Sequence, residues 1–318
     1  MKAVEEIRMG KDDYAIRASN LTKSFGSVIA VDDMSFRVNK GEIFGFLGPN
    51  GAGKTTTIRM LTGILTPDKG EVIIDGIDLR KNPVRAKTRI GVIPEIGNVY
   101  VDLSAKENLS LTGRYYGLSR DLIEKKTRDL LTSLGLFERR DDLVRTFSKG
   151  MKQRISIACA IIHEPQILFL DEPTEGLDVQ SRRLMLDTIY RVNKQGCTVF
   201  LTTHNIEEAN KLCERVCIIN KGKIVATDRP EKLKSAFDKT QSIEVSFDRK
   251  IEQESLSHNP IIKVELFGDK WRLYTTDPDR AIKYVVALAQ EEGMHILSLT
   301  TCGPSLEEAF IRLTGGGG

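Results

Sequence analysis

The stretch that decides the fold runs from Gly48 to Thr56 and reads Gly-Pro-Asn-Gly-Ala-Gly-Lys-Thr-Thr. Its first eight residues have the spacing G-x-x-x-x-G-K-T of a phosphate-binding loop, or P-loop. The glycines let the backbone wrap tightly, so that successive N–H groups point inward at a phosphate. The apolar run Ile43–Leu47 before it has the character of a buried strand, and Thr57–Leu61 after it has the character of a helix. The sequence therefore predicts a nucleotide phosphate site at a strand–loop–helix junction.

Within the P-loop, each residue type has a physical task. Lys54 places a positive charge near the β- and γ-phosphates, and the Thr55 hydroxyl can ligate Mg²⁺. The following helix adds free N–H groups and the positive end of its dipole. We expect the phosphates to contact Gly48, Asn50, Gly51, Gly53, Lys54, Thr55 and Thr56.

Composition excludes several classes of protein. The chain has 318 residues, enough for one large domain or two unequal ones, with 40% hydrophobic and 29% charged residues, as in ordinary soluble globular proteins. The net charge of +3 is too small to argue for nucleic acid by itself. No run approaches the roughly 18 apolar residues that span a bilayer, and the polar start lacks an apolar signal core. We expect a cytoplasmic chain that does not itself cross a membrane.

The five cysteines have neither disulfide nor metal spacing. Their number is odd and no C-x-x-C occurs, so we interpret them as small buried hydrophobic residues in a reducing compartment. They are Cys159, Cys197, Cys213, Cys217 and Cys302.

The order of patterns along the chain predicts an α/β protein. Residues 1–14 are a leader, and short strands follow at 15–18, 28–31 and 34–38. Apolar residues at helical spacing then predict a helical insert over about 100–162. Residues 15–235 form the main domain, and 236–318 form a small α+β unit with strands, a helix over 281–292 and a last helix over 305–313.

Two acidic residues end a second apolar run. Leu168–Leu170 precede Asp171 and Glu172, as expected of a buried parallel strand that delivers carboxylates at its C-terminal end. Asp171 is suited to bind Mg²⁺, directly or through water, and Glu172 to polarise an attacking water as general base. The alternative is a solvated acidic turn. Beside a P-loop, we favour the functional interpretation.

Two further residues are ambiguous from the residues alone. His204 follows the buried strand 197–203 and emerges at the same sheet edge as Glu172, so a structural and a functional role are about equally supported. Phe25 lies beside Gly26 in a polar stretch, where an aromatic ring can stack on a nucleotide base. On its own, an ordinary core phenylalanine is the better interpretation of Phe25.

Taken together, residues 16 to about 235 resemble the ATP-binding-cassette (ABC) ATPases. Gly48–Thr55 matches the Walker A loop, and Leu168–Asp171 followed by Glu172 matches Walker B and its catalytic glutamate. Phe147–Met151 matches the family signature, usually L-S-G-G-Q, and Glu175–Asp178 matches the D-loop.

The resemblance also implies roles for the two ambiguous residues. His204 matches the switch histidine, and Phe25 matches the aromatic residue that stacks on adenine, which reverses the preference for a core residue. Catalytic roles thus fall on Glu172, His204 and Lys54.

This sequence departs from the family pattern at two places. Lys149 and Met151 replace Gly and Gln in the signature, whereas Ser148 and Gly150 remain to offer a hydroxyl and N–H groups to a γ-phosphate. Glu95 stands where the family usually has the Q-loop glutamine. Its carboxylate can still ligate Mg²⁺, but it cannot donate a hydrogen bond as an amide can. The resemblance thus gives Thr55, Glu95 and Asp171 as metal ligands.

The resemblance implies a P-loop NTPase core with an antiparallel β subdomain, a helical subdomain and the small C-terminal α+β domain. It implies that ATP and Mg²⁺ bind, and that two cassettes, here expected to be identical, close head to tail. Ser148, Gly150 and Asp178 of one chain then reach the site of the other.

In this family the cassette works with a transmembrane permease, here expected on a separate chain, from the cytoplasmic face of the membrane. The stretch Pro304–Gly315 and the Ser-Lys-Gly-Met signature resemble those of prokaryotic drug- and lipid-exporter-like systems. We expect an exporter ATPase with no nucleic-acid partner. The alternative is a soluble cassette ATPase acting on nucleic acid or ribosomes.

Overall fold

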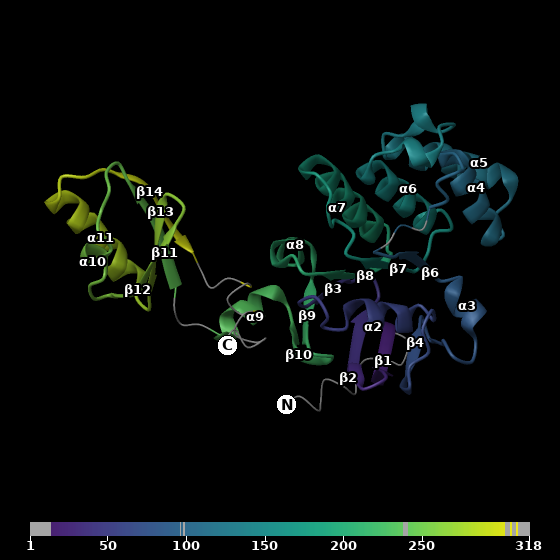
Figure 1. Cartoon of the computed structure of the whole chain (residues 1–318), viewed down its shortest axis with the longest axis horizontal. Coiled ribbons are helices and arrows are strands. Elements are labelled where there is room, and N and C mark those ends of the chain that lie inside the picture. The colour runs from purple at the N-terminus through teal and green to yellow at the C-terminus, as the bar shows by residue number, and fades with distance from the viewer. Residues whose placement is uncertain are drawn as a thin grey trace. The chain divides into compact units, whose positions relative to one another are not determined.

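The computed structural model describes residues 14–95, 97, 99–237, 241–302, 306 and 310. It divides into two compact units, one up to Arg229 and one from Pro230 onward (Figure 1). The sequence boundary was expected between residues 235 and 236. Helix α9 (Pro230–Phe237) therefore falls in the second unit, whereas the pattern assigned most of it to the first.

The first unit contains an antiparallel sheet in the order β2-β1-β4-β5. Its strands are β1 (Tyr14–Phe25), β2 (Val28–Asn39), β4 (Lys69–Ile74) and β5 (Ile77–Asp78). The two short strands predicted at 28–31 and 34–38 are one strand, β2. Asp33 has a φ of +51° at a shift in the β1–β2 register, so a bulge accommodates the polar residues without ending the strand.

A second sheet carries the P-loop and has the order β10-β9-β3-β8-β7-β6. Its neighbours are parallel except for the β9–β10 pair. Strand β8 lies between β3 and β7, so the residues that follow these three strands meet at one edge of the sheet. The strands are β3 (Ile43–Leu47), β6 (Ile90–Ile93), β7 (Ile167–Asp171), β8 (Thr198–Thr203), β9 (Arg215–Asn220) and β10 (Lys223–Asp228).

The core of this unit joins the two sheets through helix α2 (Lys54–Leu61). Helix α2 contacts β7 of the parallel sheet and β2 and β4 of the antiparallel sheet. Phenylalanines from both sheets pack there, and the ring centres of Phe36 on β2 and Phe46 on β3 lie 5.5 Å apart. Burying one such side chain stabilises the fold by about 1.5–3 kcal/mol. The P-loop is therefore anchored at both ends by buried elements.

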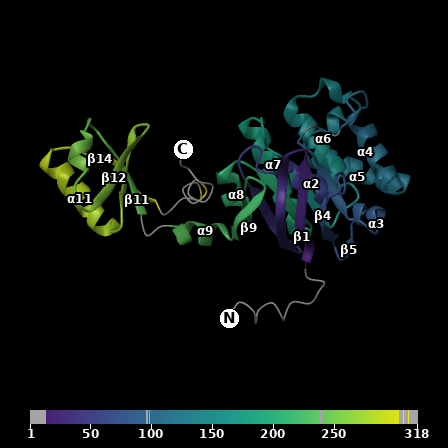
Figure 2. The ribbon, with the colours of Figure 1, turned by 60° about the horizontal axis from the view of Figure 1, so that its bottom comes forward.

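The predicted helical insert is present, and its helices lie together at one end of the unit (Figures 1 and 2). Serines cap all three of its α-helices, because Ser104, Ser119 and Ser148 each accept a hydrogen bond from the backbone of the first turn. These helices are α4 (Ala105–Tyr115), α5 (Arg120–Ser133) and α6 (Lys149–Ile161), with 3₁₀ turns at Phe137–Arg139 and Val144–Thr146. The other helices described in the first unit are α3 (Pro83–Lys87), α7 (Val179–Lys194) and α8 (Ile206–Leu212).

The second unit is an antiparallel sheet in the order β12-β13-β11-β14, and α11 packs against β11 and β14. Its core includes Ile243, Leu273 and Val285. The elements are β11 (Gln241–Phe247), α10 (Gln253–Leu256), β12 (Ile261–Phe267), β13 (Lys270–Thr275), α11 (Pro278–Glu291) and β14 (Ile296–Cys302). Of the helix predicted over 305–313, Leu306 and Phe310 are described and helical, and the rest lies outside the described residues. The predicted leader also lies outside them, apart from its last residue.

Burial of the cysteines is confirmed where their side chains are described. Cys159, Cys197, Cys213 and Cys217 are free and buried, and burial raises the pKa of Cys159, Cys197 and Cys217 to about 12. Over the described part of the chain, none of the helices combines the length and the apolar character that crossing a membrane requires.

Candidate active site

The P-loop joins β3 to α2, and at two of its positions the backbone leaves no room for a side chain. Gly53 has a φ of +104°, and a Cβ there would lie 2.5 Å from the Ala30 carbonyl oxygen. A Cβ on Gly48 would lie 2.8 Å from the Ile219 carbonyl oxygen. Gly53 caps α2 without a side-chain hydrogen bond, so the first N–H groups of the helix are left for a ligand.

Lys54 is held in this loop by oxygen atoms on several sides. Its side chain is 6% exposed, and its Nζ donates to the carbonyl oxygens of Gly48 at 2.7 Å and Pro49 at 3.3 Å. The same Nζ lies 3.1 Å from Oε1 of Glu172, which is 8% exposed. The P-loop cation and the Walker B carboxylate therefore form a buried ion pair.

A pocket of about 400 Å³ opens beside this pair. It brings together residues from four separate stretches, because Phe25, Glu95 and Glu172 line it together with the P-loop. The P-loop contributes Pro49, Asn50, Gly51, Gly53, Lys54, Thr55 and Thr56. Ala30 and Glu175 also line the pocket, although the sequence predicted a nucleotide contact for neither of them.

The Glu172 carboxylate is placed by the neighbouring strand β8. Its backbone has a φ of +49°, a region that few residues other than glycine adopt, and its N–H donates to the carbonyl and hydroxyl oxygens of Thr202. Its Oε2 accepts from the His204 N–H at 3.3 Å and lies 3.0 Å from His204 Nδ1. Oε1 is buried and, despite its distance from Lys54, makes no hydrogen bond with the described residues.

This geometry suits proton transfer at a water molecule. A carboxylate that a histidine holds beside a phosphate-binding loop can accept a proton from an attacking water. His204, whose role was open from the residues alone, lies within hydrogen-bond distance of that carboxylate.

Asp171 lies deeper than its neighbour. It is 2% exposed, and its Oδ1 accepts a hydrogen bond from the Thr202 hydroxyl at 2.5 Å. It is not among the residues that line the pocket. Thr202 contacts both acidic residues and was not singled out from the sequence. The signal available was the pair of polar residues Thr202 and Thr203 at the end of a buried strand.

Phe25 and Glu95 lie on the outer side of the pocket. Phe25 ends β1 and is 52% exposed, with Lys23 Nζ 5.8 Å from the centre of its ring. An exposed ring at a pocket rim is free to stack on a base. Glu95 is exposed, two residues after β6 ends. Its carboxylate and the Thr55 hydroxyl are oxygen donors that suit Mg²⁺.

Ser148, Gly150 and Asp178 lie away from this pocket in their own chain. The hydroxyl of Ser148 caps α6, and Gly150 packs so closely on Ser181 that a Cβ would collide with it. Asp178 caps α7 at the Ser181 N–H, and this hydrogen bond lowers its pKa. Lys149, which replaces a glycine of the signature, places its Nζ against Gly176 of the D-loop.

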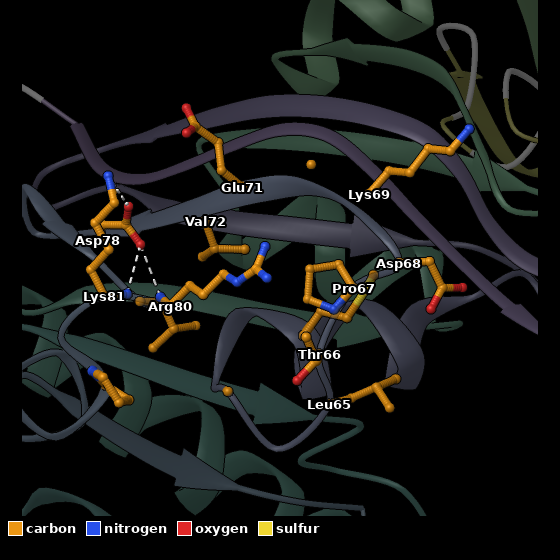
Figure 3. Close-up of a pocket in the computed structure, with 15 residues that line it drawn as sticks. Leu65, Thr66, Pro67, Asp68, Lys69, Glu71, Val72, Asp78, Arg80 and Lys81 are labelled. Carbon is orange, nitrogen blue, oxygen red and sulfur yellow. Dashed lines mark hydrogen bonds and ion pairs between the residues drawn. The ribbon is translucent and has the colours of Figure 1, made fainter.

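A larger pocket, of about 510 Å³, lies between the end of α2 and strands β4 and β5 (Figure 3). Its lining includes Leu65, Pro67 and Val72, and Figure 3 shows Arg80 extended between Val72 and Pro67. Asp78 accepts hydrogen bonds from the backbone of Arg80 and Lys81. This mixture of apolar and charged side chains, without a glycine-rich cradle, suits a protein segment better than a nucleotide.

Comparison with known proteins identifies the family. A family model described as ABC transporter matches residues 31–175. The chain is 36% identical over 305 residues to the linearmycin resistance ATP-binding protein of Bacillus subtilis, covering 94% of this chain and 98% of that protein. It is also 36% identical over 313 residues to the Nod factor export ATP-binding protein I of Sinorhizobium fredii, covering 98% of this chain and 90% of that protein.

A solved structure agrees with the fold. An ATP-binding cassette, solved as a dimer in a post-hydrolysis state with ADP and Pi, matches with a TM-score of 0.63 and 25% identity, over 67% of this chain and 98% of that one. None of these proteins is named for work on nucleic acid or ribosomes, so they do not support that alternative. Together with the P-loop pocket, they show that this chain belongs to the ABC transporter family and is an ATP-binding subunit with ATPase activity.

Proposed function

We propose that this chain is the ATPase subunit of an ABC exporter and that it drives a permease carried on a separate chain. The observation that carries the proposal is the arrangement of Lys54 and Glu172 in the P-loop pocket, with His204 held against Glu172. Export is supported by the name of the Nod factor relative, which aligns over 90% of its length. In this proposal the permease, and not this chain, selects the transported substrate.

The pocket supports the following roles for its residues. Phe25 stacks on the adenine, and the N–H groups between Gly48 and Thr56 hold the phosphates. Lys54 neutralises the β- and γ-phosphates. Glu172 takes the proton of the attacking water, and His204 holds Glu172 in place. The uncapped N–H groups at the start of α2 fit the phosphates of a triphosphate, and the Glu172 carboxylate beside Lys54 fits its attacking water.

The donor set around Thr55 fits Mg²⁺. We place the Thr55 hydroxyl and the Glu95 carboxylate as ligands, because both line the pocket. Asp171 acts at longer range, since it is buried behind Glu172 and bonded to Thr202. When bound, the ion neutralises charge on the phosphates as the terminal one is transferred.

A second cassette completes the site. Ser148 is exposed at the start of α6, in the position to present its hydroxyl and the helix N-terminus to a phosphate on another chain. Asp178 starts α7 nearby, and Gly150 allows the two helices to approach closely. We propose a head-to-tail homodimer. A cassette of this fold has been solved as a dimer, which supports pairing of two cassettes.

The permease contacts the face that carries exposed apolar residues after Glu95. Tyr100 is 55% exposed and precedes α4, the first helix of the insert. The larger pocket adds a second contact, because Ile64 and Val84 are exposed beside residues that line it. This assignment places the chain at the cytoplasmic face of the membrane as a peripheral subunit.

Co-purification tests the proposal. Tagged Glu172→Gln protein is isolated from native membranes in mild detergent with ATP, beside a Lys54→Ala control that weakens nucleotide binding. We expect a multi-span membrane protein in stoichiometric amount with Glu172→Gln. Recovery of ribosomes or nucleic acid, or of no membrane protein, would refute the transporter assignment.

A further inference from the structure

A cavity of about 260 Å³ lies between α4 and α5 and shares no described lining residue with the nucleotide pocket. We call it the α4–α5 pocket. Glu124 is the one carboxylate among its described lining residues. The cationic side chains in that lining are Lys106, Arg114, Arg120, Arg128 and Arg140.

The spacing of these cations along α4 and α5 brings them to the same cavity. Lys106 and Arg114 are eight residues apart on α4, with Ser110 midway, so all three lie on one helix face. The same spacing separates Arg120 and Arg128 on α5. Two cationic helix faces therefore converge on one concave surface.

Three of these cations have no partner in the part of the chain that is described. The side chains of Lys106, Arg114 and Arg120 form neither ion pairs nor hydrogen bonds there. Like charges held together repel one another, and the repulsion is stronger beside a protein surface than in bulk water. An anion in the pocket would relieve this repulsion.

The other two cations are already positioned. The guanidinium carbons of Arg140 and Arg128 lie 4.5 Å and 5.9 Å from the centre of the Phe137 ring. Arg140 Nη1 also donates to the Phe137 carbonyl oxygen at 3.1 Å. A stacked guanidinium loses little freedom when it binds an anion.

An independent observation comes from the wall of the same cavity. Thr127 is 6% exposed, and its hydroxyl makes no hydrogen bond with the described residues. A buried hydroxyl without a partner is unfavourable and is uncommon in folded proteins. A ligand oxygen in the pocket would provide the missing partner.

We propose that the α4–α5 pocket binds a phosphate-bearing anion. A phosphate offers several oxygens and up to two negative charges, which match convergent arginines better than a single carboxylate does. The headgroup of an acidic phospholipid and a free phosphate ester share this chemistry. The site is separate from the P-loop and adds a second anion-binding function to the chain.

Calorimetry with glycerol 3-phosphate tests the site in the full chain. Saturating ADP fills the P-loop, so that heat from the probe reports the α4–α5 pocket. We expect Arg120→Gln to weaken binding about tenfold, the loss of one charge-assisted contact. Lys125→Gln removes the same charge from the same helix outside the lining and should change little. Glu124→Gln removes the opposing carboxylate and should strengthen binding.

The Thr127→Val variant distinguishes an effect on anion binding from an effect on folding. Valine keeps the shape and removes the unpartnered hydroxyl, so we expect thermal stability to hold or rise while affinity for glycerol 3-phosphate falls. An unchanged affinity in both Arg120→Gln and Thr127→Val would overturn the proposal. Equal losses in Arg120→Gln and Lys125→Gln would also overturn it, because general surface charge would then explain the binding.

Vesicle flotation distinguishes the two sources of phosphate. Vesicles of phosphatidylcholine with phosphatidic acid are compared with vesicles of phosphatidylcholine alone, again with ADP present. Flotation that requires phosphatidic acid and Arg120 assigns the pocket to a lipid headgroup. Binding of glycerol 3-phosphate without flotation assigns it to a free phosphate ester. Binding of neither probe refutes the site.

Discussion

Lys54 Nζ and Glu172 Oε1 lie 3.1 Å apart in a largely buried ion pair at the base of the nucleotide pocket. The cation proposed to bind the phosphates is therefore neutralised by the carboxylate proposed to activate water. A phosphate that binds Lys54 has to displace the Glu172 carboxylate from the Lys54 ammonium group. This exchange frees the carboxylate only when nucleotide is bound, which limits proton transfer to the loaded site.

Glu172→Gln should separate binding from hydrolysis. The amide removes the negative charge that competes for Lys54, so we expect ATP to bind at least as tightly as in the wild type. Loss of the general base should lower turnover by a factor on the order of 10²–10⁴. Nucleotide binding by fluorescence titration and phosphate release measure the two effects.

Glu175→Gln is the matched control for this change. Glu175 lines the same pocket but is exposed, and we assign it no catalytic role. Turnover in Glu175→Gln should stay within about tenfold of the wild type, which corresponds to 1.4 kcal/mol. If Glu172→Gln retained wild-type turnover, the assignment of Glu172 would be wrong.

His204→Ala should lower turnover while nucleotide binding persists. The imidazole lies 3.0 Å from Glu172 Oε2 and is not among the residues that line the pocket. Losing a hydrogen bond to a charged group is worth about 1.5–3 kcal/mol, or about 10–100-fold in rate. Single-turnover measurements at saturating ATP isolate this step. A variant with weakened ATP affinity and normal turnover would instead show that His204 serves binding.

Glu95→Gln should keep ATPase activity. The amide oxygen can still ligate a cation, and the change removes a negative charge beside the phosphates. We expect turnover to change by less than about tenfold. Steady-state phosphate release at several Mg²⁺ concentrations is the measurement. Abolished turnover would mean that the carboxylate of Glu95 has a role of its own.

Gly53→Ala should disrupt the P-loop. The added Cβ would meet the Ala30 carbonyl oxygen, and the φ of +104° is strained for alanine. Such strain costs about 1–3 kcal/mol of stability, and we expect nucleotide binding to be lost. Gly51→Ala is the control, because its φ is +78° but no atom lies within 4 Å of the added Cβ. Thermal unfolding and ATP titration of both variants separate strain from collision, and equal behaviour would exclude collision as the cause.

Acid should loosen the contact between the helical insert and β6. Burial lowers the pKa of His163 to about 4, and its ring stacks on Tyr116 with both side chains bonded to the Ile90 carbonyl oxygen. In the unfolded chain the pKa is the ordinary 6.5. At pH values between these two pKa values, the unfolded chain binds more protons than the folded chain. The free energy of unfolding therefore falls as the pH falls.

Between about pH 7 and about pH 5, this difference amounts to at most about 2 kcal/mol of unfolding free energy, because water screens the partly exposed ring. His163→Gln keeps a donor for the Ile90 carbonyl but does not titrate. Urea unfolding at both pH values should show a smaller loss in the variant than in the wild type. Identical losses would show that His163 does not contribute to acid sensitivity.

Much of the fold could be predicted because its signals are local. The strand–loop–helix around Gly48–Thr55 and the strand that ends at Asp171 each appear in a few consecutive residues. Strand β2 was predicted as two pieces, one on each side of Asp32 and Asp33. Pairing with β1 keeps both residues within the strand as a β-bulge. No local sequence pattern reveals this pairing.

The sequence by itself determined the phosphate-binding chemistry, the carboxylates after the buried strand and the family resemblance, since residue type and spacing fix these. Only the tertiary structure decided that Thr202 supports both Asp171 and Glu172, that Lys54 pairs with Glu172, and that cations of α4 and α5 face one cavity. The physical reason is that these contacts join residues far apart in the chain. Their distances depend on the order of strands in the sheet and on how the helices pack, and neither is encoded in any single stretch.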